Sequence, residues 1–514
     1  SQSRVRYVKP YTWVPAGLVI LLSLILRLYS LDAPSIWGDE ACMVNLTRQS
    51  PVQILDALMS ADRPDVDVAP PLYFLSLHAW QIALGASVSD FRAFSVIWGV
   101  LAVIGTMILA RRISDSHTAI LAGLIMACNP FQIWYSQEIR MYSMASALSA
   151  FVLCGFVDYL RDRKQRDAWI SSVSLSALLM TQYYGFLLLS SLAVLTAVWL
   201  VRDASLRKKP LDLFLIVGLP LIVFSPWIPT LWLDFTQANH SGGFPSYFHP
   251  IKSLIFIFLK FSSFGNEAFI QHHPVLISSA ALIFMILILR AVISLRDVQW
   301  VLPSSILIPV GLVFVACMSG VNMYKPHPFI MFHSSFIVLT AIGIRRFRMP
   351  LSGLLLLGVL VAHLMVLLRL NFGDTYVKPR VKEIAARIDS ESSAADRVAV
   401  LPAFLPNPSP IVGDLLAYRY YSRRGDVVYL TGDNADDIIE VLESAFPQGH
   451  RLFLVYQLNP QVMDQIESIR AHLAESYMRV DREQFPSKIR GFSMGFDVYE
   501  ARHADRSDPY GYSE

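Results

Sequence analysis

Two neighbouring carboxylates, Asp39 and Glu40, lie in the stretch PSIWGDEACM, directly after the first long apolar run of the chain. A carboxylate in such a place can take the proton from an incoming hydroxyl group and so act as a general base. A structural role is the alternative for both residues. Asp39 follows a glycine and suits the N-cap of a helix, and Glu40 suits the first turn, where the helix dipole favours an acid.

A second group of polar side chains interrupts the sequence at the ends of its long apolar runs. Its members are Arg92, Tyr135, Gln137, Glu138, Arg140, Tyr142, Tyr183, Tyr184, Lys325 and His327. A cation beside hydrocarbon is costly unless an anion pairs with it, and a lipid phosphate is the natural anion at headgroup depth. We therefore expect Arg92, Arg140 and Lys325 to line one cavity for a lipid phosphate. Snorkelling cations and interfacial aromatic residues are the alternatives.

The composition indicates what surrounds these residues. Of 514 residues, 54% are hydrophobic and only 16% are charged, and the mean hydropathy is +0.46. A soluble globular chain has fewer apolar and more charged residues, so this composition indicates an integral membrane protein. The net charge of +3 implies no nucleic-acid partner. The four cysteines show no paired spacing, which predicts neither a disulfide framework nor a zinc motif.

About eleven apolar runs are long enough to cross a bilayer, and the fold class that we expect is a polytopic α-helical membrane protein with about 11 to 13 spans. The runs cover residues 12–29, 91–110, 117–134, 141–160, 168–182, 184–201, 211–232, 273–295, 300–319, 328–344 and 350–369. Lys and Arg are concentrated in every second connection, which the positive-inside rule assigns to the cytoplasm. The remaining connections and the C-terminus are therefore expected to face the exterior.

This topology leaves two long exterior loops, residues 30–90 and 233–272. The stretch 70–85 is apolar but short and contains polar residues, so we predict that it forms an interfacial helix. The stretch 251–264 in the second loop predicts another such helix. Both loops are thus expected to carry short helices rather than irregular chain.

The sequence SPVQ in the first loop predicts the start of one of these short helices. Ser50 suits the N-cap, Pro51 suits the first helical position, and Gln53 follows three residues after the cap. This pattern is a capping box, and we expect the helix to run to about residue 59. The first loop would then form a shaped lid.

We expect two domains: a membrane module over residues 1–370 and a smaller exterior α/β domain over residues 371–514. The second part lacks long apolar runs and alternates strand-like with helical pieces. The strand-like pieces are RVAVLPAF, DVVYLTG, RLFLVYQL and GFDVYEA, and the helical ones are VKEIAARIDS, DDIIEVLESAF and NPQVMDQIESIRAHLAES. No motif in it predicts catalysis, and HADRSDPYGYSE at its end predicts a disordered tail.

Six stretches, taken in order, resemble the GT-C membrane glycosyltransferases of the protein O-mannosyltransferase and aminoarabinose-transferase type. They are LDAPSIWGDEACMV, APPLYFLSLHAW, SDFRAFSVIWGVLAVIGTMILARRI, NPFQIWYSQEIRMYSM, TQYYGFLLL and SPWIP. The likeness covers roughly the first 235 residues. It implies that Asp39 is the catalytic base with Glu40 in support, and that Arg92 matches an arginine at the start of the second span. Basic and tyrosine side chains at outer helix ends would hold the lipid phosphate.

One region departs from the pattern of this family. In the family a late helix usually begins with an Arg-Tyr pair, and here that region reads KPHPFIMFHSSF, so Lys325 or His327 would take the place of that arginine. The resemblance implies an inverting transfer of a sugar, a hexose or a pentose, from a polyprenyl-phosphate donor such as undecaprenyl or decaprenyl phosphate. The expected acceptor is a hydroxyl of an envelope glycan, a glycolipid or a protein. The expected location is the bacterial inner membrane, with the site facing the periplasm.

Such a transfer requires no cofactor, and we predict no metal site. A divalent ion held by His240, His249, His272 and His273 near Glu267 is the alternative, although their spacing fits no known pattern. A transporter or flippase of lipid-linked sugars is a rival function, but the sequence shows neither an internal repeat nor broken midplane helices. A non-catalytic scaffold derived from a glycosyltransferase would have the same sequence features, and only turnover separates it from an enzyme.

Overall fold

The computed structural model divides into two units that we describe separately. It describes residues 13–60, 69–203, 206–240, 249–263, 274–321, 323–372, 378–401, 417–430, 435–445, 451–457, 463–485 and 494–501. The helical unit comprises Ser1–Leu31, Thr47–Ala61 and Val68–Asn371. The sheet unit comprises Asp32–Leu46, Asp62–Asp67 and Phe372–Glu514. The segment with the two carboxylates therefore groups with the C-terminal part of the chain rather than with the helices that flank it.

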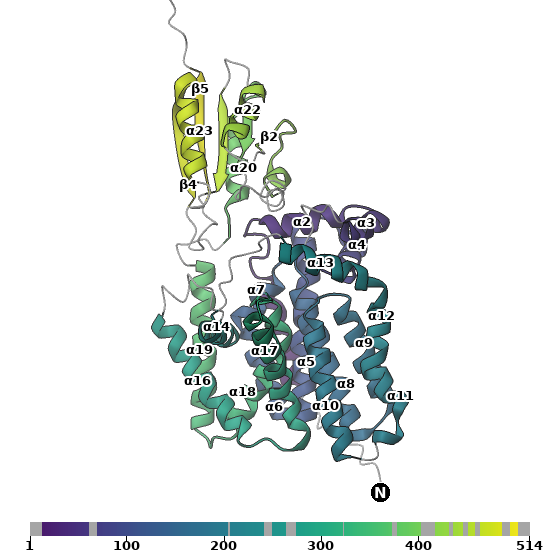
Figure 1. The fold of residues 1–514 in the computed structure, drawn as a ribbon. Coiled ribbons are helices and arrows are strands. Elements are labelled where there is room, and N and C mark those ends of the chain that lie inside the picture. Colours follow the sequence, from purple (N-terminus) through teal and green to yellow (C-terminus); the bar gives the residue numbers. More distant parts are fainter. Residues whose placement is uncertain are drawn as a thin grey trace, which may run out of the picture. The chain divides into compact units, whose positions relative to one another are not determined.

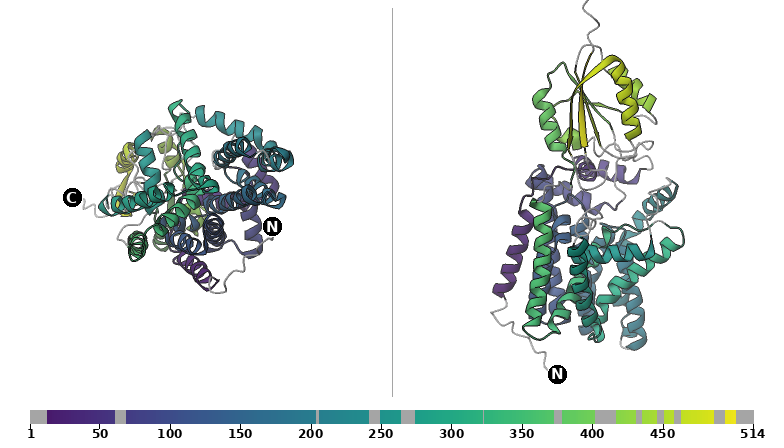
Figure 2. Two further views of the ribbon diagram at one scale, coloured as in Figure 1. Left: turned by 90° about the horizontal axis from the view of Figure 1, so that it is seen from below. Right: turned by 90° about the vertical axis from the view of Figure 1, so that its left-hand side faces the viewer.

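The helical unit is a bundle in which the long helices run side by side (Figure 1) and are seen end-on in the left view of Figure 2. Its helices are α1 (Trp13–Leu28), α3 (Pro51–Met59), α4 (Leu72–Leu84), α5 (Val88–Ile113), α6 (Ser116–Cys128), α7 (Pro130–Ser136), α8 (Tyr142–Asp162), α9 (Gln165–Leu179), α10 (Gly185–Arg202), α11 (Pro210–Leu213), α12 (Leu219–Phe224), α13 (Ile228–His240), α14 (Pro250–Ser263), α16 (Pro274–Val292), α17 (Val301–Met318), α18 (His333–Arg345) and α19 (Leu351–Phe372). Short 3₁₀ turns, η5 (Asp297–Trp300) and η6 (Pro328–Phe332), lead into α17 and α18.

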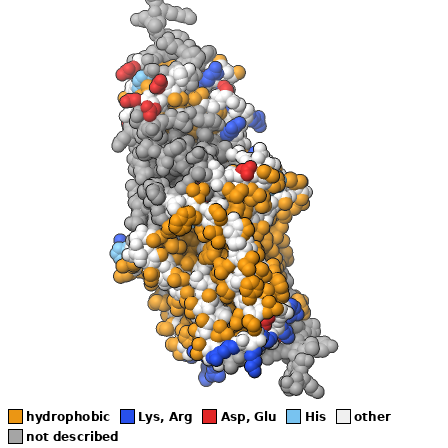
Figure 3. All heavy atoms as spheres, turned by 45° about the vertical axis from the view of Figure 1, so that its right-hand side comes forward, with side chains coloured by type: hydrophobic (Ala, Val, Ile, Leu, Met, Phe, Trp, Pro, Cys, Tyr) orange, Lys and Arg blue, Asp and Glu red, His pale blue; other side chains and the backbone are white. Residues whose placement is uncertain are grey.

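Seven of the described helices are long and apolar enough to cross a membrane, and Figure 3 shows the hydrophobic surface of this unit. They are Val88–Ile113, Tyr142–Asp162, Gly185–Arg202, Pro210–Thr236, Asp297–Met318, Pro328–Arg345 and Leu351–Leu370. A further pair, α6 and α7, qualifies together but is bent by 61°, which makes eight if the pair is one span. The predicted membrane-protein class is confirmed, whereas the expected count of 11 to 13 spans is not, because several expected spans form shorter helices.

The short helices of the two loops that we predict to be exterior form where the sequence predicted them. The Ser50 side chain accepts a hydrogen bond from the Gln53 backbone N–H, and the Gln53 side chain accepts from the Ser50 backbone N–H, so α3 begins with the predicted capping box. Helix α4 begins at Leu72 inside the predicted stretch 70–85, and α14 coincides closely with the predicted stretch 251–264.

Small and hydroxyl-bearing residues allow the central helices to approach closely. A Cβ atom added at Gly155 of α8 would lie 2.5 Å from the backbone nitrogen of Ser171 in α9, so only glycine fits there. The Thr106 hydroxyl of α5 donates to the Ser334 hydroxyl of α18 at 2.9 Å, deep in the bundle. Such contacts are typical of helices that associate in a membrane, where apolar burial does not drive association.

The sheet unit contains a five-stranded sheet of order β2-β1-β3-β5-β4. Its elements are α2 (Gly38–Thr47), α20 (Val381–Glu391), β1 (Arg397–Val400), β2 (Val428–Tyr429), α22 (Ala435–Ala445), β3 (Leu452–Gln457), α23 (Met463–Ser476), β4 (Tyr477–Phe485) and β5 (Met494–Ala501). β1 is parallel to β2 and β3, and β5 is antiparallel to β3 and β4. The predicted α/β class is confirmed, and β4 is a strand that the sequence reasoning missed.

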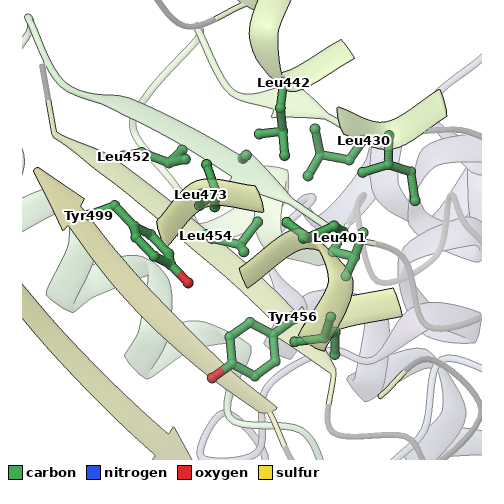
Figure 4. Packing of buried hydrophobic residues seen from close by; sticks show 12 residues of the cluster. Leu401, Leu430, Leu442, Leu452, Leu454, Tyr456, Leu473 and Tyr499 are labelled. Atoms are coloured by element: carbon green, nitrogen blue, oxygen red, sulfur yellow. The ribbon is translucent and has the colours of Figure 1, made fainter. Parts of the chain in front are cut away.

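Helices cover both faces of this sheet, as the right view of Figure 2 shows. Leu442 of α22 and Leu473 of α23 pack against Leu454, Tyr456 and other residues of one face, and Figure 4 shows this cluster from close by. These side chains alternate along β3 with residues of the opposite face, which is the period of a strand buried on both sides. The predicted disordered tail, residues 503–514, lies outside the described residues.

Candidate active site

The two carboxylates differ in their surroundings within the sheet unit. Both lie in the first turn of α2, where the helix dipole favours an acid. The Glu40 side chain is fully buried, and its carboxylate accepts a hydrogen bond from the ammonium group of Lys378 at 3.2 Å, which is itself buried. Asp39 is half-buried. Glu40 therefore balances a buried charge, and Asp39 is the acid of the pair that keeps access to solvent.

Two further contacts hold the acidic segment against the C-terminal part of the chain. The Ile36 backbone N–H donates to the Tyr421 hydroxyl at 2.8 Å, and the Lys382 backbone N–H donates to the Ser35 hydroxyl at 3.0 Å. Together with the Glu40–Lys378 ion pair, they fix α2 by residues more than 330 positions away in the sequence. Residues of the C-terminal part of the chain thus hold the segment that carries Asp39.

In the helical unit, the tight connection between α7 and α8 positions Arg140. The Arg140 backbone N–H donates to the carbonyl of Glu138 at 2.8 Å, so the chain turns back sharply there. The guanidinium group donates to the Tyr142 hydroxyl at 3.3 Å and lies 5.5 Å from the centre of that ring. The Tyr142 ring in turn makes an edge contact with the ring of Tyr135, at 5.0 Å between centres. Arg140, Glu138 and both tyrosines are largely buried.

Lys260, at the end of α14, completes this group from a distant part of the chain. Its ammonium nitrogen lies 2.9 Å from Nδ1 of His327 and 3.4 Å from the hydroxyl of Tyr135, and the latter two side chains also hydrogen-bond to each other. Burial lowers the pKa of Lys260 to about 7, against the attraction of Glu138, which favours the charged form. Helix α14 has 14 residues and is not among the described helices that are long and apolar enough to cross a membrane.

The end of α14 is anchored by polar side chains in the bundle interior. The His333 ring bonds to the carbonyl of Phe261 at 2.9 Å, and the His363 ring bonds to the carbonyl of Ser262 at 2.9 Å. The Asn129 amide also donates to the Phe261 carbonyl, at 3.2 Å. The last carbonyls of a helix have no partner within it, so these bonds satisfy them and set where Lys260 lies.

The connection before η6 brings Lys325 and His327 to the same place. The Tyr184 hydroxyl accepts a hydrogen bond from the Lys325 backbone N–H at 3.0 Å and donates to the Met323 carbonyl. The Tyr324 hydroxyl donates to the Ser253 carbonyl of α14 at 3.1 Å. This connection is thus tied both to the start of α10 and to α14, while Lys325 is exposed and the His327 ring hydrogen-bonds to Lys260 and Tyr135.

Lys260 hydrogen-bonds to His327, and Arg140 and Lys325 are close enough to act on the charge of the same imidazole. The pKa of His327 is well below its usual value, first because the ring is desolvated and second because Lys260, Arg140 and Lys325 repel a further positive charge. Of the carboxylates, Glu138 is close enough to act on Lys260. We call Arg140, Lys260, Lys325 and His327 the cation cluster. A site with this charge, lined by tyrosine hydroxyl groups, favours an anion with several acceptor oxygens.

Two residues that we predicted to bind the donor, Arg92 and Gln137, contact the end of α1. The Arg92 guanidinium is fully buried and donates to the Leu31 carbonyl at 2.8 Å. The Gln137 amide donates to the carbonyls of Arg27 and Tyr29, at 3.0 and 2.9 Å. These bonds satisfy carbonyls at and beyond the helix end. The structure therefore gives Arg92 and Gln137 contacts that position the end of α1.

Tyr183 also points to a different partner from the one expected. Its hydroxyl donates to the carboxylate of Asp234 in α13 at 2.6 Å and accepts from the Trp227 indole N–H at 3.0 Å. This pair of bonds ties the start of α10 to α13. Of the ten residues proposed for the donor, the structure brings Tyr135, Glu138, Arg140, Tyr142, Tyr184, Lys325 and His327 into one neighbourhood around Lys260.

Lys260 is the functional candidate that sequence reasoning missed. The stretch 251–264 was predicted as a helix, and Lys260 is the basic residue in its last turn. A lone basic residue at the end of an apolar helix was the available signal. The anchors His333 and His363 gave no signal, since each is an isolated histidine inside an apolar run.

The alternative metal site falls mostly outside the described residues. His272, His273 and Glu267 are not described, and His249 is exposed. Within the described parts of the chain, no group of three or more His, Cys, Asp or Glu residues could hold a metal ion. The expectation that no metal is needed stays a prediction.

No protein-family model and no curated protein sequence matches the chain, but solved structures match its fold. ArnT from Cupriavidus metallidurans bound to undecaprenyl phosphate has a TM-score of 0.59 at 14% identity, over 95% of this chain and 98% of that chain. The apo state of that ArnT has a TM-score of 0.58 at 14% identity, and the match covers 95% of this chain and 97% of that chain. A third match is the oligosaccharyltransferase AglB from Archaeoglobus fulgidus, in complex with an inhibitory peptide and a dolichol-phosphate. Its TM-score is 0.50 at 11% identity, and the match covers 98% of this chain and 75% of that chain.

Proposed function

Since the chain has the GT-C fold, we propose that it is an inverting glycosyltransferase that moves a sugar from a polyprenyl-phosphate donor to an acceptor hydroxyl group. The cation cluster is the observation that supports this most directly, because its basic side chains and the tyrosine hydroxyl groups beside them suit a phosphate. A solved structure with the same fold, ArnT, holds undecaprenyl phosphate. The polar ends of the helices and the apolar bundle surface suit a ligand that has a charged head and a long hydrocarbon tail.

In this proposal the cation cluster acts on the leaving group. The donor is a phosphodiester with about one negative charge, whereas the departing polyprenyl phosphate is a monoester with up to about two. Arg140, Lys260 and Lys325 attract the second form more strongly than the first, so they stabilise the charge that develops as the glycosidic bond breaks. Tyrosine hydroxyl groups beside them would donate further hydrogen bonds to phosphate oxygens.

The acceptor must lose a proton as it attacks, and we assign that proton to the carboxylate of Asp39. Attack on the anomeric carbon from the face opposite the phosphate inverts its configuration. Glu40 acts through its buried pair with Lys378, which keeps the first turn of α2 in place, and is a positioning residue in this scheme. We propose further that the reaction takes place at the outer face of a bacterial inner membrane, on an envelope glycan, a glycolipid or a protein.

The experiment that tests this function uses the purified full-length protein in proteoliposomes. It is incubated with a panel of polyprenyl-phosphate hexoses and pentoses, with and without a crude envelope acceptor, and the release of free polyprenyl phosphate is measured. We expect release with one donor class and its loss in Asp39→Asn, by about 10² to 10⁴-fold, which is the usual size of a general-base contribution. The matched control is Asp32→Asn, an exposed acid of the same segment whose partner is Lys382, which should leave the rate unchanged.

Three outcomes would contradict the proposal in different ways. Release of polyprenyl phosphate at an unchanged rate by Asp39→Asn would show that another group takes the proton. Binding of donor to the cation cluster without release, for every donor and acceptor tried, would favour the scaffold derived from a glycosyltransferase. Movement of intact donor across the vesicle membrane would favour the flippase.

A further inference from the structure

The far end of the bundle carries a second set of cations that the proposed reaction does not use. Helix α8 begins at Tyr142, beside the cation cluster, and ends at Asp162. At about 1.5 Å per residue, its two ends are roughly 30 Å apart, so nothing at the far end can contact a phosphate in the cation cluster. Figure 3 shows Lys and Arg side chains gathered at one end of the hydrophobic surface.

Two cavities open at this far end. One has a volume of about 670 Å³ and is lined by residues of α8, α10 and the turn between α16 and α17, Arg161 and Arg296 among them. The other has a volume of about 640 Å³ and lies against the end of α5, with Arg111 and Arg112 in its wall. Arg161 lines both cavities, so they are neighbours. Each is large enough for a group well beyond the size of a single ion.

Positive charge predominates in these walls. The five arginines are Arg111, Arg112, Arg161, Arg296 and Arg346. Among the described residues that line the cavities, Asp297 is the one carboxylate, and Asp158 pairs with the lining residue Arg112 at 2.6 Å. Positive side chains therefore outnumber negative ones by three. All five arginines except the half-buried Arg112 are exposed, which leaves their guanidinium groups accessible to a ligand.

The first cavity also has an apolar side. Leu160 and Leu295 form part of its wall and are buried, the Trp199 ring is half-buried, and Ile293 is 71% exposed at the rim. A free phosphate in water would gain nothing from such a wall. A phosphate that carries acyl chains would bury apolar surface there while its charge meets the arginines.

The backbone that forms the cavity wall is held in one shape. The Gln299 amide donates to the carbonyl of Ile113 at the end of α5, at 3.1 Å, and its oxygen accepts from the Arg296 backbone N–H at 2.9 Å. These bonds join the turn between α16 and α17 to the end of α5. The cavity thus exists before any ligand arrives, which lowers the conformational cost of binding.

We propose that these two cavities bind the headgroup of an anionic phospholipid, with the phosphodiester between the arginines and the start of the acyl chains against Leu160, Leu295 and Trp199. The basic end is the one that the positive-inside rule assigns to the cytoplasm, and the inner leaflet supplies such lipids. Basic pockets between transmembrane helices at that surface are known sites for lipid headgroups. The site does not depend on the proposed glycosyl transfer.

Native mass spectrometry of the purified full-length protein tests this site. The protein in detergent is titrated with phosphatidylglycerol and, separately, with phosphatidylcholine of the same acyl chains. We expect phosphatidylglycerol to bind more tightly, and the double variant Arg296→Ala with Arg346→Ala to weaken it by about 30-fold, at roughly fivefold per arginine. The matched control is Arg290→Ala with Arg348→Ala, which removes two exposed charges from the same end but none from a cavity wall.

A second variant keeps every charge and fills the space. Ser294 lines the first cavity. The variant Ser294→Trp should fill the space for the headgroup and weaken the binding of phosphatidylglycerol as much as the double arginine variant does. If the control variant Arg290→Ala with Arg348→Ala weakens phosphatidylglycerol binding equally, the lipid is attracted by diffuse surface charge and the proposed site is wrong. Equal binding of phosphatidylcholine would overturn the charge recognition. Displacement of the lipid by an equimolar amount of inorganic phosphate would show that a free anion is the ligand instead.

Discussion

Replacement of Lys260 by methionine should weaken donor binding without unfolding the bundle. Methionine keeps an unbranched stem of similar length, so the packing of that stem beside Phe131 and Phe256, whose rings lie 5.6 Å from the ammonium nitrogen, should survive. The variant loses one charged hydrogen bond to the phosphate, which is typically worth about 1.5 to 3 kcal/mol. The dissociation constant of the donor should therefore rise by about 10- to 150-fold.

The pH dependence of donor binding provides a sharper test of the same residue. Burial lowers the pKa of Lys260 to about 7 in the free protein, so the amine is mostly neutral at pH 8 and above. The donor is a phosphodiester and does not titrate near neutral pH. An anion favours the charged amine, so binding must take up a proton at alkaline pH, and affinity should fall by up to about tenfold per pH unit above pH 7. Below about pH 6 the affinity should be constant.

Equilibrium binding of labelled donor to the protein in nanodiscs, at several values between about pH 6 and 9, measures both effects. Lys260→Arg keeps its charge over this range and should give a flat profile, and Lys260→Met should give a flat and weaker one. Lys252→Met is the matched control, since Lys252 is an exposed lysine of the same helix. Native affinity in a folded Lys260→Met protein would refute the assignment of Lys260 to the phosphate, and a flat native profile would refute its titration near pH 7.

Three further predictions concern other charged groups. Arg140→Ala should raise the KM for the donor by about 10-fold or more in the release assay, because it removes a charged ligand. Glu40→Gln and Lys378→Met should each lower stability by about 3 to 5 kcal/mol, and the double variant by less than their sum, as measured by thermal unfolding of the full-length protein. Burial of the Asp396 carboxylate opposes its ionisation, but hydrogen bonds from Arg451 and Ser393 lower its pKa to about 2. Asp396→Asn should therefore lower the free energy of unfolding by about 1 to 2 kcal/mol above pH 4. The difference between the two proteins should vanish as the pH falls through about 2.

The controls for these predictions use exposed groups of the same kind. Arg202→Ala, at the exposed end of α10, should leave the KM of the donor unchanged. Lys382→Met removes an exposed ion pair with Asp32 and should cost less than about 1 kcal/mol. Additive costs in the Glu40–Lys378 cycle would show that the two side chains do not stabilise each other. A constant effect of Asp396→Asn across the pH range would show that its charge is not what stabilises the sheet unit.

The elements that the sequence predicted well are those with a local signal. Helix α3 has its capping box within four residues, and α20 and α22 have apolar residues at helical spacing. Strand β4 was missed because YMRVDREQF contains charges throughout. It lies at the edge of the sheet, where among the described strands it pairs with β5 alone, and most of its residues are exposed. An edge strand of this kind carries polar residues that prevent pairing with other chains, and these hide its period.

The sequence predicted those site residues that lie at the ends of apolar runs. Arg140 and Lys325 could be placed together because both stand at ends of apolar runs that the predicted topology puts on one side of the membrane. In the structure, both lower the pKa of His327. Arg92 stands at a run end as well, yet its guanidinium bonds to the Leu31 carbonyl. Position along a span thus indicates the depth of a side chain but not the direction in which it points. That direction depends on the neighbouring helix, which the sequence of one chain does not identify.

The bend between α6 and α7 shows why a hydropathy count could not replace this information. Residues 117–134 are apolar enough for one span, but the Asn129 side chain accepts from the Gln132 backbone N–H and so begins a new helix there. The Asn129 amide also donates to the Phe261 carbonyl, one residue after Lys260. One polar side chain therefore ends α6, starts the helix that carries Tyr135, and holds the helix that carries Lys260. A single asparagine in an apolar run hardly changes the hydropathy of that run, yet here it sets where two members of the site lie.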